Sequence, residues 1–307
     1  MVNNKVQDEL IKTIDEPLDF TEDELIENTK VKSDFWKRLF KNKVAIFGFT
    51  IIVMLVLVAI LAPLIAPYPF DEQSLKNMLE PSSLQHWMGT DEFGRDIFSR
   101  IVYGSRISLQ VGFIAVGIAL SIGTVLGALA GYYGGIIDYL ISAITDIAWA
   151  FPTTLLAIAF IAALGPSLIN VMIAVALVNW SAYARLVRGE FLSLREQEFV
   201  EAARVLGMGD LRIIFRHILP NAIAPIIVLT TLQVPQAIII EASLSFLGLG
   251  AQPPTPSWGS ILSSGRSYIQ QAPWVAIFPG IMIMIVVLGF NLFGDALRDV
   301  LDPRLND

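Results

Sequence analysis

Two carboxylates stand inside long apolar runs of this sequence, and their chemistry needs an explanation first. Asp146 and Glu241 each interrupt such a run, and Gln233 and Gln236 precede Glu241 on the same run. A charged group inside a membrane is costly, so it usually lines a polar pathway or pairs with another helix. The sequence leaves both interpretations open. We therefore regard these four residues as candidates for lining a translocation path.

No residue pattern in the chain predicts catalysis. The sequence contains no GxxxxGK[ST] phosphate loop, no HExxH pair, no GxSxG elbow and no cysteine. Its two histidines, His86 and His217, lie far apart. A proton relay would be expected to contain more ionisable residues than the single, widely separated span carboxylates. We therefore expect no enzymatic activity, no metal site and no cofactor bound by this chain.

The composition indicates an integral membrane protein. The 307-residue chain has 54% apolar and 16% charged residues and a mean hydropathy of +0.63, whereas soluble domains carry roughly 25% charged residues. Six apolar runs approach or exceed the length that crosses a bilayer. They lie at about 44–66, 108–131, 136–164, 168–186, 222–247 and 274–293. We predict an all-α protein with six transmembrane helices in a domain that covers 44–307.

Two shorter segments precede the first run. Residues 1–29 contain nine acidic residues and two lysines, which account for the whole formal net charge of −7. We expect residues 1–32 to form a disordered cytoplasmic tail. In 33–43, SDFWKRLFKNK, aromatic and leucine side chains alternate with basic ones, which predicts an amphipathic interfacial helix. A solvated leader to the first span is the alternative.

Two features concern the second run. Before it, Ile97, Ile101 and neighbouring apolar residues form a stripe beside charged residues, which predicts a separate helix near the surface. Within it, Gly123, Gly127 and Gly131 recur every four residues. Such a row of glycines predicts a smooth groove against which another helix packs closely.

A polar stretch at 196–220, EQEFVEAARVLGMGDLRIIFRHILP, separates the fourth and fifth runs. A first short helix can be ended by Gly207 and Gly209, because glycine adopts positive φ readily. Asp210 is a suitable N-cap for a second helix, and Pro220 predicts where that helix ends. The expected result is two short helices at a sharp angle. Their charges require water on one side, and we expect a partner there.

The distribution of basic residues predicts the orientation. Of the 21 Lys and Arg residues, sixteen lie before residue 44, in 185–220 or after the last run. The five others lie in the opposite connectors. Basic residues accumulate on the cytoplasmic side of membranes. We predict that both termini and the loop at 187–221 are cytoplasmic, and that 67–107 and 248–273 are external.

Four stretches in order resemble permease subunits of ATP-binding-cassette (ABC) importers. EAARVLGMGDLRIIFRHILPN resembles the EAA loop of that family, with His217 at a position where the family has Ile. GTDEFGRDIFSRIVYGSRISL, GLGAQPPTPSWG and LDPRL resemble stretches of the "C" permease of dipeptide and oligopeptide importers, in the peptide/nickel branch. The residues carried over to ATPase coupling are Glu201, Ala202, Ala203, Gly207, Asp210, Leu219 and Pro220.

The resemblance implies a type I ABC importer permease fold in a bacterial or archaeal inner membrane. It implies that the chain forms half of a pore with a second homologous permease subunit. Two cytoplasmic ATPase subunits would hold ATP and Mg, and an extracellular or periplasmic binding protein would deliver di- or oligopeptides. The branch also includes importers of nickel, glutathione and some sugars. No nucleic acid is expected as a partner, and 95–109 with 252–259 is expected to contact the binding protein.

A stand-alone secondary transporter of a small polar solute is the alternative. Such transporters place polar groups at the membrane midplane on broken helices. Pro225, Pro235 and Glu241 in the fifth run give this alternative slight support. Purification as an active single subunit would favour it, whereas neighbouring genes for a second permease, a binding protein and ATPases would favour the importer.

Overall fold

The computed structural model describes residue 39 and residues 41–301. The expectations for 1–32, for most of 33–43 and for the LDPRL stretch beyond Leu301 lie outside the described residues. The chain divides into two compact units, 1–43 and 44–307. The second unit carries the spans and the candidate sites.

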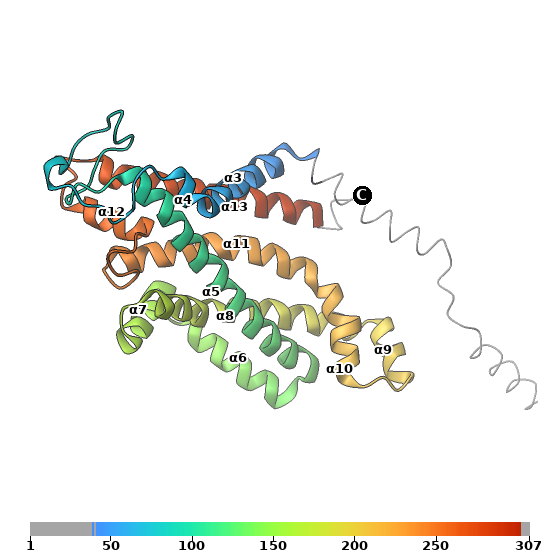
Figure 1. Ribbon diagram of the computed structural model, residues 1–307. Helices are drawn as coiled ribbons and strands as arrows, with labels where there is room; N and C mark the ends of the chain where they lie inside the picture. Colours follow the sequence, from blue (N-terminus) through green and yellow to red (C-terminus); the bar gives the residue numbers. More distant parts are fainter. Residues whose placement is uncertain (1–38, 40, 302–307) are drawn as a thin grey trace, which may run out of the picture. The chain divides into compact units, whose positions relative to one another are not determined.

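The second unit is a bundle of long helices (Figure 1). Its helices are α3 (Lys43–Ile60), α4 (Ala62–Ile65), η1 (Leu75–Asn77), α5 (Ile97–Tyr133), α6 (Gly135–Trp149), α7 (Thr153–Leu164), α8 (Leu168–Leu194), α9 (Glu198–Val205), α10 (Asp210–Ile213), η2 (Ile214–Ile218), α11 (Leu219–Phe246), α12 (Trp258–Arg266) and α13 (Trp274–Leu301). Among the described residues, five helical stretches are long and apolar enough to cross a membrane, and the bent pair α6–α7 counts as a sixth if it forms one span. The prediction of an all-α membrane protein is confirmed.

The glycine row on α5 packs against α8, as predicted. A Cβ on Gly127 would lie 2.5 Å from the carbonyl oxygen of Ala184, and one on Gly131 would lie 2.5 Å from the Cβ of Phe191. Gly123 is equally close to α8. Since real Cβ atoms do not approach backbone so closely, only glycine allows this helix spacing.

The prediction of a separate surface helix around 97–102 is wrong. These residues form the first turns of α5, and Asp96 caps the helix by accepting a hydrogen bond from the backbone N–H of Ser99. Ile101 is buried, and its carbonyl oxygen accepts a 3.1 Å hydrogen bond from Nε1 of Trp258 in α12. The apolar stripe therefore packs against protein rather than against the membrane surface.

The third predicted span, 136–164, is broken into α6 and α7, which meet at 96°. Pro152 lies at the break. Proline has no N–H to donate and disfavours the helical conformation in the residue before it, which explains the interruption. Asp146 and Trp149 consequently lie in the last turns of α6 rather than in the middle of a straight helix.

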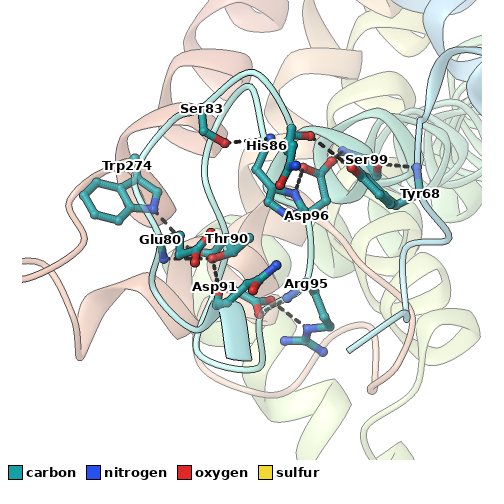
Figure 2. A network of polar contacts seen from close by, with 12 residues as sticks. Tyr68, Glu80, Ser83, His86, Thr90, Asp91, Arg95, Asp96, Ser99 and Trp274 are labelled. Carbon is teal, nitrogen blue, oxygen red and sulfur yellow. Dashed lines mark hydrogen bonds and ion pairs between the residues drawn. The ribbon is translucent and has the colours of Figure 1, made fainter. Parts of the chain in front are cut away.

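Buried polar contacts hold the connector between α4 and α5 (Figure 2). The carboxylate of Asp91 accepts a 2.6 Å hydrogen bond from Nε of Arg95. Nδ1 of His86 lies 2.9 Å from Oδ1 of Asp96. These buried polar side chains are accommodated because each has a close partner.

The connector and the segment around α12 meet at one end of the bundle, and α9 with α10 lies at the other (Figure 1). Nε1 of Trp274 donates a 3.2 Å hydrogen bond to the carbonyl oxygen of Thr90, which joins the connector to α13. The helices therefore place the two segments predicted as external at one end. They place the polar stretch that resembles the EAA loop at the opposite end.

Candidate functional site

The short helix α9 is held on the bundle by two of its residues. Val200 is fully buried and Ala203 is 3% exposed. Both belong to an apolar cluster with Phe191 of α8 and Ile213 of α10. An isolated helix of this length is not stable in water, so α9 depends on this packing for its position and direction.

Polar contacts add a second connection between this end of α5 and the α9–α10 segment. The hydroxyl of Tyr132 donates a 2.8 Å hydrogen bond to Oδ1 of Asp210, and the Arg204 guanidinium lies 5.7 Å from the centroid of the Tyr132 ring. Gly209, and not Asp210, is the N-cap of α10. The predicted capping role of Asp210 is therefore wrong, because its carboxylate is engaged by Tyr132.

The turn after α9 reverses at Gly207. This residue has φ +74°, and its N–H bonds to the carbonyl oxygen of Arg204 at 2.9 Å. A Cβ on Gly207 would find no heavy atom within 4 Å, so a substitution would meet only backbone strain. Gly209 has φ −71°, so the positive φ predicted there is wrong.

Pro220 does not end the second helix, contrary to the prediction. The helical backbone continues from α10 through the π turn η2 into α11, and Pro220 lies in the first turn of α11. Proline cannot donate to the carbonyl four residues earlier and its ring crowds that group. The π turn, in which the N–H of Leu219 bonds to the carbonyl oxygen of Ile214, accommodates it. The predicted second short helix is thus the beginning of the fifth span.

The outer side of the α9 turn is exposed and largely apolar. Glu201 and Ala202 are exposed. Val205, Leu206 and Leu211 are 82%, 73% and 68% exposed. Apolar side chains that gather on a surface are typical of a protein interface. Leu219 is half-buried and Pro220 exposed, both at the start of α11.

A cavity of about 590 Å³ lies between the α6–α7 break, α8 and α11. Its polar lining residues are Thr153, Asn179, Ser181, Arg185, Gln233 and Gln236. The structure therefore brings the two glutamines predicted for the path to one cavity. Much of the remaining wall is apolar, with Trp149 and Phe151 from the break.

We call this 590 Å³ space the central cavity. Asp146 lies beside the central cavity and is not among its lining residues. It lines a smaller cavity of about 330 Å³, and Arg185 lines both. Nη2 of Arg185 donates a 2.8 Å hydrogen bond to Oδ1 of Asp146. The Arg185 guanidinium also lies 4.2 Å from the centroid of the Trp149 ring, and Nε1 of Trp149 donates to Oγ of Ser181 at 3.0 Å.

Glu241 is separate from the central cavity and is fully buried. Its Oε1 accepts a 2.7 Å hydrogen bond from Ser245 on the same helix, and its Oε2 accepts a 3.1 Å bond from Ser108 on α5. These contacts match the interpretation in which the carboxylate pairs with another helix, here α5, rather than the one in which it lines a path. The helix α11 continues through Pro225 and Pro235 without a break.

Comparisons with known proteins identify the family. The model of the family described as "Binding-protein-dependent transport system inner membrane component" matches residues 123–307. The chain belongs to the permeases of ABC importers. A second model, the N-terminal TM domain of oligopeptide transport permease C, matches residues 32–81 of the permease.

Individual relatives and solved structures agree with this assignment. The permease is 58% identical to the dipeptide transport system permease protein DppC of Alkalihalophilus pseudofirmus, over 88% of this chain and 89% of that protein. It is 50% identical to the glutathione transport system permease protein GsiD of Escherichia coli, over 89% and 90% of the two chains. A structure of the MetNI methionine ABC transporter in an inward facing conformation matches with TM-score 0.55 and 21% identity, over 66% of this chain and 97% of that one. This last likeness shows the fold, that of a type I ABC importer permease.

Sequence reasoning missed several cavity residues of the permease. The apolar run predicts that the fourth span ends at Leu186, with Arg185 and Arg188 in the polar loop. The helix α8 instead continues to Leu194. Both arginines instead face acids of α6, because Arg188 pairs with Asp138 as Arg185 pairs with Asp146. The available signal was the spacing of three between the two arginines, which places them on one face of a helix. Within residues 41–301, no group of three or more His, Cys, Asp or Glu side chains could hold a metal ion.

Proposed function

We propose that this permease imports small peptides and that α9 couples it to an ATPase subunit. The observation that carries the coupling proposal is the position of Glu201 and Ala202, exposed on a helix whose other side is packed into the bundle. The peptide proposal is supported by relatives that are named for dipeptide and glutathione transport, since both of these solutes are peptides.

The contacts of α9 explain how a displacement of this helix by a bound ATPase would be transmitted to the membrane spans. Val200 and Ala203 pack against α8 and α10, and α10 continues through η2 into α11. The helix α11 contributes Gln233 and Gln236 to the central cavity. A movement of α9 is therefore transmitted to the cavity wall by packed helices, which behave as rigid elements in a two-state change.

The proposed complex contains a second homologous permease, two ATPase subunits and an external binding protein. ATP and Mg belong to the ATPases in this proposal, and hydrolysis is theirs. The count of basic residues supports a cytoplasmic position for α9 and both termini in this proposal. Because the chain has no native cysteine, a single cysteine at Leu206 tests this orientation. A membrane-impermeant thiol reagent should label it in inverted vesicles, and labelling from outside intact cells would contradict the proposal.

The structure favours a different position for the contact with the binding protein that the sequence predicts at 95–109. Most of this stretch is buried at the start of α5, including Arg100 and Ile101. Exposed apolar side chains at that end are found on the connector, where Leu84 and Trp87 are 97% and 59% exposed. We propose that the binding protein contacts this part of the connector.

The experiment for the proposed function is reconstitution of the permease with its genomic partners in proteoliposomes. Labelled dialanine should accumulate only with binding protein outside and ATP inside. Glu201→Lys should abolish uptake and release the ATPase during purification. Glu72→Lys is the matched control for ATPase retention, because Glu72 is also exposed but lies on the connector at the other end. Uptake of a sugar, nickel or free amino acid in place of dialanine would refute the peptide proposal.

The family assignment removes the reason to propose a stand-alone secondary transporter. The matching family is defined by dependence on a binding protein. Glu241, one of the features that favoured the alternative, is buried between serine hydroxyls and does not line the central cavity.

A further inference from the structure

One residue that lines the central cavity has an unpartnered side-chain donor. Asn179 is only 6% exposed, and its side-chain nitrogen finds no hydrogen-bond partner among the described residues. Asn179 lines the cavity. Buried polar groups are nearly always paired, and an unpaired one needs an explanation. This nitrogen is itself buried, so it reaches a ligand in the cavity when the Asn179 side chain turns toward it. A ligand carbonyl or carboxylate oxygen would then supply the missing acceptor.

Arg185 offers a second recognition group at the same place. Its side chain is 47% exposed and that of Asp146 is 71% exposed, so their ion pair is open to solvent and exchangeable. The planar guanidinium presents a fork of donors that fits a carboxylate in two parallel hydrogen bonds. Trp149 holds the guanidinium at the cavity wall by contact with its ring. A ligand carboxylate could therefore replace Asp146 as the partner of Arg185.

The helix α11 adds lining groups that suit amide bonds. Gln233 and Gln236 are three positions apart on α11 and line the same cavity. Each carboxamide offers both donors and an acceptor, as a peptide backbone does. The volume of about 590 Å³ also falls within the range of sites for small molecules.

We propose that this cavity binds the backbone of a peptide during its passage, with Arg185 on the terminal carboxylate and Asn179 on a peptide carbonyl. Asp146, which lines the adjoining smaller cavity, is then released from Arg185 and can pair with the peptide's ammonium group, which keeps the charges balanced. The proposal rests on the proposed function and deepens it. It means that this chain itself selects for peptides with free termini, in addition to any selection by the binding protein.

The test measures binding to the assembled transporter in nanodiscs without the binding protein. Trp149 is one of six tryptophans in this chain. Its fluorescence emission is therefore obtained by subtracting the emission of the Trp149→Phe transporter from that of the wild type. Dialanine should change this emission saturably, and its C-terminal amide should bind about tenfold more weakly, because a charge-assisted hydrogen bond is lost. Asn179→Leu and Arg185→Gln should each weaken dialanine binding about tenfold, whereas Arg185→Lys should keep the preference for the free carboxylate. Gln110→Leu is the control, since Gln110 is exposed on α5 and does not line the cavity.

Equal affinity for dialanine and its amide would overturn the proposal, as would wild-type affinity in Asn179→Leu. A phospholipid headgroup has similar anionic chemistry, so discs of phosphatidylcholine and phosphatidylglycerol are compared. Loss of dialanine binding in phosphatidylglycerol would identify the ligand as lipid and overturn the proposal. Uptake in proteoliposomes is measured separately. Dialanine uptake with no selective binding here would refute only this inference, and failed uptake would refute the proposed function.

Discussion

Ala202 and Ala203 are neighbours in the sequence but lie on different sides of α9, and this difference gives a sharp prediction. Ala203 is 3% exposed within the apolar cluster, whereas Ala202 is exposed. Leucine at 203 would add three carbons to a packed interior, which costs about 1–3 kcal/mol. Leucine at 202 should change stability by less than about 0.5 kcal/mol, because the site is exposed and leucine is a good helix former.

The assay combines stability with coupling. The melting temperature of the purified permease should fall by several degrees in Ala203→Leu, at about 2–4 °C per kcal/mol, and should stay at the wild-type value in Ala202→Leu. ATPase activity stimulated by loaded binding protein should nevertheless fall about tenfold or more in Ala202→Leu, because leucine obstructs close approach of the ATPase. Wild-type stimulation in a stable Ala202→Leu transporter would refute the reasoning. A stable Ala203→Leu protein would refute the assigned packing of α9.

Three further changes test other parts of the structure. Gly207→Val should abolish dialanine uptake while the permease remains in the membrane, since valine is strained at φ +74°; substrate-stimulated ATPase activity at the wild-type level would contradict this. Gly127→Leu should prevent accumulation of folded permease, because the new Cβ would lie 2.5 Å from a backbone oxygen of α8. The control Gly117→Leu should accumulate normally, since a Cβ on Gly117 has no atom within 4 Å. Equal amounts of the two variant proteins would argue against this packing. Glu241→Leu should lower the melting temperature, because it leaves two serine hydroxyls without an acceptor and each costs at most about 1–3 kcal/mol of folding free energy. Glu241→Gln should lower the melting temperature less. Equal melting temperatures for the two variants would refute the pairing role of Glu241.

Much of the fold could be predicted from local sequence patterns. Long apolar runs predict the spans because membrane burial requires them, and the row from Gly123 to Gly131 predicts close packing because it depends on one helix face. The boundaries were less predictable. The polar beginning of α5 is helical because Ile97 and Ile101 pack against α12, a tertiary contact that no local pattern displays.

The candidate sites, too, contain some features that the sequence predicts and others that depend on tertiary contacts. The turn at Gly207 could be predicted from glycine alone, but the continuation of α10 through Pro220 could not, because the π turn that accommodates the proline has no simple signature. The central cavity was predicted only in part. Gln233 and Gln236 were identifiable as polar residues in an apolar run, whereas the unpaired state of Asn179 depends on what surrounds it in three dimensions.

Cross-linking of α9 in the assembled transporter tests the central claim most directly. A photoactivatable residue at Leu206, which is 73% exposed, should form an adduct with the ATPase subunit. The same residue at Trp87, exposed on the connector, should form an adduct with the binding protein and none with the ATPase. An intact complex in which Leu206 yields no ATPase adduct, or in which Trp87 yields one, would contradict the proposed role of α9.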